Sequence, residues 1–262
     1  MSHTPSLETL RQRIRVLEGS ARDAGRVLPL GLAALDDALP WGGLPLGCLH
    51  QVVGDAEDPA EAATGPAAAL GFAALLAARM AARDAGTVLW CVRHGSADDT
   101  LYPPGLAQLG LPPRQLMIAR ARDDGQVLGC LEDGLRTPGL AAVVGQARAV
   151  DLTAGRRLQL AAEAGGVTGL LLAPAGQGRA TGGGMGSVAA TTRWRVRPRP
   201  AAPVDWPGLG PVRWDVTLER CRSGRPARWT MEWDDETHAL SVVAPLRDGS
   251  GDASRGRLRR RA

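Results

Sequence analysis

Short apolar runs alternate with helical patterns from residue 48 to residue 173, and this alternation constrains the fold more than any other feature. The runs have the length of strands and lack polar alternation, which is typical of strands buried on both faces of a sheet. They occupy residues 48–53, 87–93, 116–120, 140–144 and 167–173. Because helical segments separate them, the pattern predicts an α/β domain with a mostly parallel sheet covered by helices on both faces.

The pattern changes after Pro174. Residues 175–187 are rich in glycine and have no periodicity, which predicts a loop. Strand patterns then follow one another without helices between them, and they contain four tryptophans. These patterns cover residues 188–196, 212–220, 225–233 and 238–243. We expect antiparallel hairpins that extend the parallel sheet at its C-terminal end.

The turn after the first apolar run has the ground plan of a phosphate-binding loop, because a strand, a glycine and a helix start follow in order. In the register of G-x-x-x-x-G-K-[ST] the loop begins at Gly54, and its last three positions are Pro59, Ala60 and Glu61. The chain contains no lysine, so no shift in register restores the residue that contacts the phosphates. The loop is therefore expected to be degenerate, with no nucleotide cofactor.

Acidic residues in this turn agree with that interpretation. Asp55, Glu57, Asp58 and Glu61 would place negative charge beside a polyphosphate, which disfavours binding. They also have a structural explanation, because Asp58, Pro59 and Glu61 fit an N-cap, a first-turn proline and a capping-box glutamate. The turn is thus interpreted as a helix start kept for structure.

The positive charge of the chain belongs to its C-terminal tail. All 31 basic residues are arginine, and the formal net charge is +4. Residues 246–262 contain six arginines and two aspartates, so the remainder of the chain is neutral. This tail is expected to be unfolded, and it is either a solvated extension or an electrostatic contact for DNA or an acidic protein. The candidate contacts are Arg255, Arg257, Arg259, Arg260 and Arg261.

An amphipathic helix is predicted over residues 5–24. Its apolar side chains follow 3-4-3 spacing, with arginines between them. They are Leu7, Leu10, Ile14 and Leu17, and they are candidate contacts for a partner or for the domain itself. The chain is thus divided into an N-terminal helix and connector (1–27), a core domain (28–245) and a basic tail (246–262).

The four cysteines show no paired spacing, which argues against a disulfide framework. Zinc ligation by Cys48 with His50, or by Cys91 with His94, is the alternative to buried strand cysteines beside unrelated histidines. The second explanation is favoured, and no metal is expected. No signal peptide or membrane-spanning run is recognisable, so a cytoplasmic location is expected.

The order of elements resembles the RecA-type ATPase core, a P-loop fold. The likeness is sharpest at residues 28–54 and extends to about residue 245. Within this class three stretches are similar to the ImuA family of RecA-like proteins. They read LPLGLAALDDALPWGGLPLG at 28–47, RRLQLAAE at 156–163 and AATTRWRV at 189–196. From their order and spacing, the chain is identified as a member of that family.

The resemblance also locates the positions that hydrolysis would need. The lysine–threonine pair of the RecA phosphate loop falls at Ala60 and Glu61, the catalytic glutamate at His94 and the magnesium-associated aspartate at Gly145. Charge neutralisation, water activation and metal binding are all missing, which implies that the protein is not an ATPase. His94 is a general base in principle, but with no phosphate cradle it is interpreted as a polar strand-end residue.

Membership of the ImuA family implies a non-catalytic accessory protein in SOS-induced, error-prone translesion DNA synthesis. The implied partners are an ImuB-type polymerase homologue and an error-prone polymerase III alpha-like subunit, with RecA and single-stranded DNA as further contacts. Arg179 in the Gly-rich loop and Arg156 and Arg157 at a helix start are candidate DNA contacts, although a plain connector and a solvated helix face explain them equally well. The alternatives are a SulA-like inhibitor that binds FtsZ, and an active RecA-type ATPase.

Overall fold

The computed structural model describes six stretches of the chain: residues 26–55, 64–95, 101–148, 150–173, 189–203 and 210–245. The predicted N-terminal helix, the Gly-rich loop with Arg179 and the basic tail lie outside these stretches, so their residues stay predictions. The division of the chain into three parts stays a prediction as well.

A nine-stranded sheet of order β11-β10-β9-β8-β3-β7-β6-β4-β5 forms the centre of the fold. Five of its strands are those predicted from the apolar runs, and they pair in parallel. They are β3 (Leu49–Gly54), β4 (Thr87–Arg93), β5 (Leu116–Ala121), β6 (Leu140–Gln146) and β7 (Thr168–Ala173). The predicted α/β class with a mostly parallel sheet is therefore confirmed.

The four C-terminal strands extend the sheet beside β3. They are β8 (Thr192–Arg199), β9 (Val212–Cys221), β10 (Ala227–Asp234) and β11 (Ala239–Pro245). The last three pair antiparallel, as expected. The first, β8, also pairs antiparallel with β9, as expected, and it joins the extension to the parallel sheet by running parallel to β3. It begins four residues later than the predicted strand.

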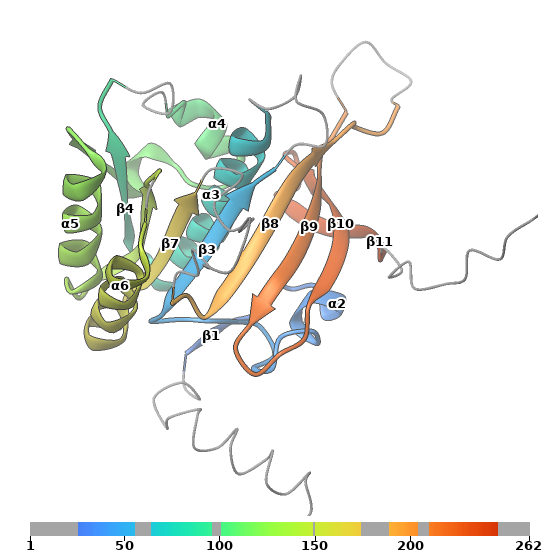
Figure 1. Ribbon diagram of the computed structural model, residues 1–262. Coiled ribbons are helices and arrows are strands. Elements are labelled where there is room, and N and C mark those ends of the chain that lie inside the picture. Colours follow the sequence, from blue (N-terminus) through green and yellow to red (C-terminus); the bar gives the residue numbers. More distant parts are fainter. Residues whose placement is uncertain are drawn as a thin grey trace, which may run out of the picture.

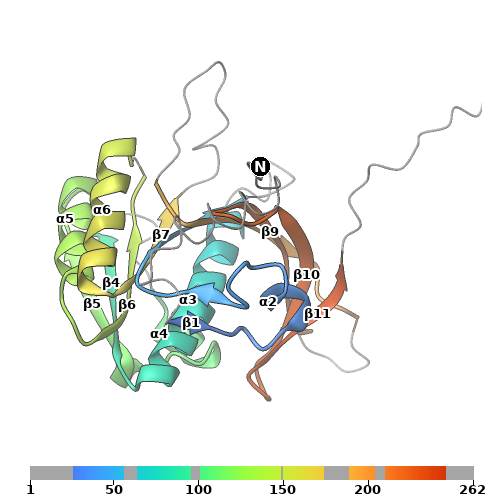
Figure 2. The same ribbon diagram turned by 90° about the horizontal axis from the view of Figure 1, so that it is seen from below.

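Helices cover the parallel part on both faces (Figures 1 and 2). α3 packs on one face, and α5 and α6 pack on the other. Short helices α2, α4 and η3 complete the described helical segments. Their bounds are α2 (Ala33–Asp36), α3 (Thr64–Asp84), α4 (Pro103–Gln108), η3 (Pro113–Gln115), α5 (Asp124–Leu135) and α6 (Leu152–Gly165).

α3 is the central helix of the core. Its many alanines bring the helix close to the sheet, and most of its side chains are buried. By length and composition it is also apolar enough to cross a membrane, but its burial within the fold marks it as a core helix.

The antiparallel strands curve around α3 (Figure 2). Four aromatic side chains form a cluster between these strands and the helix. The ring of Phe72 on α3 lies 5.7 Å from that of Trp194 and 6.5 Å from that of Trp214. Trp229 extends the cluster, with its ring 6.4 Å from that of Trp194. This cluster attaches the extension to the helix and leaves the opposite face of β8 to β10 polar.

A two-stranded sheet, β1 (Val27–Leu28) with β2 (Leu44–Pro45), was missed because two residues are too few to show periodicity. Between these strands the chain folds back through α2. Gly43 has a φ of 153°, and a Cβ there would lie 2.6 Å from the carbonyl oxygen of Leu28, so this turn requires glycine.

Candidate functional site

The strand ends that the sequence singled out lie on one edge of the sheet. β3, β4 and β6 run parallel, so Gly54, His94 and Gly145 all lie at or just beyond the carboxyl ends of their strands. In many α/β folds this edge binds the ligand. Here the backbone N–H of His94 donates to the carbonyl of Ala121 at 2.7 Å, which fixes the end of β4 against β5.

At the end of β3, the chain approaches the start of α3 with no room for a side chain. A Cβ on Gly54 would lie 2.5 Å from the carbonyl carbon of Gly65, and one on Gly65 would lie 2.7 Å from the carbonyl carbon of Asp55. Pro59, Ala60 and Glu61 fall outside the described residues. Backbone packing therefore requires glycine at position 54, whether or not a phosphate is bound.

Asp55, the first residue beyond β3, carries a carboxylate that is held by two arginines of β8. Its Oδ2 atom accepts from Arg197 Nη2 at 2.8 Å and from Arg195 Nη1 at 3.0 Å. Burial opposes ionisation of Asp55, but the hydrogen bonds and charges of the two arginines outweigh it and keep the pKa below its ordinary value. A fixed negative charge thus stands at the beginning of the loop.

At Gly145, the position of the magnesium-associated acid in the resemblance, α5 fills the space. A Cβ there would lie within 2.6 Å of Leu131 Cγ. The neighbouring residue on β4, Cys91, is buried, and this burial raises the pKa of its thiol to about 12. Among the described residues no three His, Cys, Asp or Glu side chains form a cluster suited to a metal ion.

His50, the other histidine considered as a zinc ligand, is fully buried and uses both ring nitrogens. Its Nε2 lies 2.9 Å from the carbonyl oxygen of Pro45, which can only accept, so Nε2 carries the proton. Nδ1 then accepts from the hydroxyl of Thr192 at 2.7 Å, and that oxygen accepts from Trp194 Nε1 at 2.7 Å. Cys48 lies beside the ring, with its Sγ 3.4 Å from Nε2. The group ties β3 to β8 and to β2.

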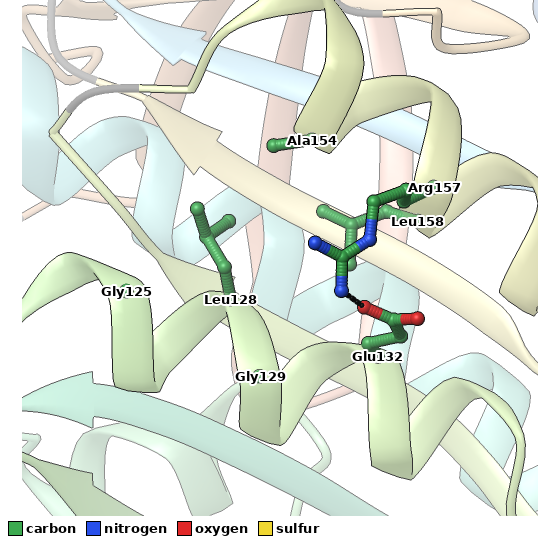
Figure 3. Close-up of a pocket in the computed structure, with 7 residues that line it drawn as sticks. All are labelled: Gly125, Leu128, Gly129, Glu132, Ala154, Arg157 and Leu158. Carbon is green, nitrogen blue, oxygen red and sulfur yellow. Dashed lines mark hydrogen bonds and ion pairs between the residues drawn. The ribbon is translucent and has the colours of Figure 1, made fainter.

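The two arginines predicted at a helix start lie on α6, as expected, but differ in surroundings. Arg156 is exposed. Arg157 reaches across to α5 and pairs with Glu132 (Figure 3). Glu132 also accepts from Arg136 Nη2 at 2.9 Å. A hollow of about 190 Å³ lies between the two helices. Its lining residues are Gly125, Leu128, Gly129, Glu132, Ala154, Arg157 and Leu158.

Sequence reasoning missed the arginines on the outer face of β8. Arg193, Arg195, Arg197 and Arg199 occupy every second position of this strand, while Trp194 and Val196 between them are buried. This two-residue period was readable in the sequence. The acidic partners of these arginines could not be predicted, because Asp55, for example, lies 140 residues before Arg195.

The fold and these strand ends define an α/β protein whose mostly parallel sheet is extended by antiparallel strands, with ion pairs and packing contacts at the loop-bearing edge. No family model matches the chain. Two curated relatives from strains of Caulobacter vibrioides, both named Protein ImuA, are 43% identical to it over 240 residues. The alignment covers 88% of this chain and 95% of each relative. The chain belongs to the ImuA family, as the sequence motifs predicted.

Proposed function

We propose that this protein is a non-catalytic accessory factor in SOS-induced, error-prone translesion DNA synthesis. Membership of the ImuA family is the observation that carries this proposal. The expected partners are an ImuB-type polymerase homologue and an error-prone polymerase III alpha-like subunit, with RecA as a further contact, in the cytoplasm. A RecA-like core that has lost its nucleotide site fits such a scaffold.

Three features support the absence of ATP hydrolysis. The chain has no lysine to neutralise a phosphate. Asp55 holds a carboxylate, paired with arginines, at the start of the loop. At Gly145 the side chain of Leu131 occupies the space that a metal-binding acid would need. The first two features disfavour binding of a charged phosphate, and the third leaves no room for a metal-binding acid.

Docking is proposed to use the N-terminal helix and the basic tail. The apolar residues Leu7, Leu10, Ile14 and Leu17 would form the buried stripe of a helix–partner contact. The tail arginines would add a salt-dependent attraction to an acidic surface.

The test is co-purification of the full chain with the ImuB-type homologue. Leu10→Glu with Ile14→Glu places two negative charges in the apolar stripe and is expected to weaken association at least tenfold. Gln12→Glu with Arg15→Gln changes the net charge equally on the polar side of the helix and serves as the matched control. Equal binding by both variants would contradict docking through this stripe.

ATP binding and turnover, with and without single-stranded DNA at low salt, test the non-catalytic part. We expect neither. DNA-stimulated turnover that disappears in His94→Ala would instead establish an active RecA-type ATPase. Co-purification with FtsZ in place of the polymerase homologue would favour a SulA-like inhibitor.

A further inference from the structure

Charged side chains cover one face of the antiparallel extension. They lie opposite the buried tryptophans. The strand register places them on one side of the sheet, because Arg197 on β8 lies beside Asp215 on β9, and Asp215 lies beside Thr230 on β10. We call this surface the arginine face. It consists of Arg193, Arg195, Arg197, Arg199, Arg213 and Arg228 with Asp55, Asp215, Glu219 and Glu232.

The described helices leave this face uncovered. α3 packs on the tryptophan side of β8, while α5 and α6 pack over β3 to β7 (Figure 1). The parallel half of the sheet is thus covered on both faces, and the outer side of β8 to β10 carries no described helix.

The acidic residues of the arginine face orient its cations without cancelling them. Asp215, only 3% exposed, pairs with Arg199 at 3.2 Å and with Arg228 at 3.1 Å. Glu232 pairs with Arg213. The six arginines exceed the four carboxylates by two charges, and each guanidinium has five N–H donors, so donors remain after these pairs are made.

The most accessible cations gather at the end of the arginine face around Asp215. The side chains of Arg199, Arg228, Arg197 and Arg213 are 45%, 36%, 28% and 25% exposed, against 13% for Arg193 at the other end. Held arginines with spare donors are suited to bidentate recognition of an anion.

We propose that the arginine face binds the phosphodiester backbone of a nucleic acid. Alternate residues of a strand lie roughly 6.6 Å apart and neighbouring strands about 4.8 Å apart, so the face presents a grid of cations to several phosphates at once. This inference rests on the proposed role in DNA synthesis, which brings the protein close to a nucleic acid. It places the DNA contact on this sheet, whereas the sequence had suggested Arg156, Arg157 and Arg179.

The composition of the face distinguishes a nucleic acid from a protein partner. Trp194, Trp214, Trp229 and Trp233 all point to the opposite side and are buried. The arginine face therefore lacks the aromatic or apolar anchors on which stable protein interfaces depend. For the same reason it offers no ring on which a base could stack. Phosphate contacts alone predict binding that is independent of sequence and sensitive to salt.

The test is fluorescence anisotropy of labelled single-stranded and duplex DNA of mixed sequence. It uses the full chain with the tail neutralised, because the tail could bind DNA by itself. The neutralised positions, each changed to Gln, are Arg255, Arg257, Arg259, Arg260 and Arg261. In this background Arg199→Gln with Arg213→Gln removes two accessible cations, while Asp215 keeps Arg228 and Thr230 as partners.

We expect this double substitution to lower affinity at low salt at least tenfold. For single strands it should also reduce the slope of log K against log salt by about 1.4, since each phosphate contact contributes about 0.7. Arg114→Gln with Arg122→Gln removes the same charge from exposed positions on η3 and just after β5, and should change affinity less than twofold. Arg199→Lys with Arg213→Lys keeps both charges without the bidentate fork, so it should bind more tightly than the Gln pair and keep the salt slope of the parent, which separates a charge effect from misfolding.

Three outcomes would overturn the proposal. If neutralising the tail abolished all DNA binding, the tail and not the arginine face would be the DNA-binding site. If the control variant lost as much DNA affinity, the loss would follow from the change in net charge and not from the arginine face. Unchanged DNA affinity in the Arg199→Gln, Arg213→Gln variant, with loss of the ImuB-type homologue instead, would make the face a protein interface. Co-purification is measured on the same variants, so failure of the DNA site and failure of polymerase docking are distinguishable.

Discussion

Acidification should destabilise this protein through His50. The histidine is fully buried, and burial outweighs its hydrogen bond to the Pro45 carbonyl and lowers its pKa from 6.5 to about 4. Protonation would require Nδ1 to donate, but Nδ1 accepts from Thr192, whose oxygen already accepts from Trp194 Nε1. The neutral ring is therefore the form that fits the fold.

The free energy of unfolding depends on pH because the pKa of His50 differs between the folded and unfolded states. A folded-state pKa below the unfolded value means that stability is fully present above pH 6.5 and is lost as pH falls toward 4. The lowering from 6.5 to about 4 corresponds to about 3 kcal/mol of unfolding free energy. For a chain of this size, that equals a fall in thermal midpoint of roughly 6–12 °C.

Urea denaturation of the full chain at pH values from 7.5 to 4.5 measures this effect. His50→Gln should be less stable at pH 7.5, because it disturbs a buried network, but its stability should depend less steeply on pH between 6.5 and 4.5. His94→Gln, at an exposed position, is the matched control and should retain the steep dependence. Parallel pH profiles for the wild type and His50→Gln would refute the reasoning, as would a His50 ring signal that titrates near 6.5 in NMR.

Three further predictions concern the edge of the sheet. Gly54→Ala should cost more than about 3 kcal/mol by denaturation, because its Cβ would collide with the backbone of Gly65, and wild-type stability would contradict this close approach. Gly145→Asp should destabilise by at least about 3 kcal/mol, since the carboxylate would displace Leu131, and it should create no ATP turnover; a gain of turnover would show that only the acid was missing. Asp55→Asn should cost about 1–3 kcal/mol at pH 7 and make stability less sensitive to acid, because the Asp55 contribution disappears as pH falls through its lowered pKa; an unchanged acid profile would argue against the ion pairs.

Much of the site region was predictable because it depends on local sequence. The lack of lysine, the positions of Gly54, His94 and Gly145 at strand ends, and the helix containing Arg156 and Arg157 all follow from patterns of a few residues. The motifs that indicated the ImuA family also have structural roles. Gln159 of the second motif, for example, accepts the backbone N–H of Leu49 at 2.9 Å and ties α6 to β3.

By itself the sequence determined the family, the parallel strands and the helices between them, because hydrophobic periodicity and capping act within short windows. Asp151 shows this, since its side chain accepts from Ala154 N and starts α6 where the sequence predicted a helix. Only the tertiary structure decided that β8 lies parallel to β3. That pairing brings Arg195 to Asp55 and creates the arginine face, because contacts between residues 140 positions apart depend on strand order, which no local pattern encodes.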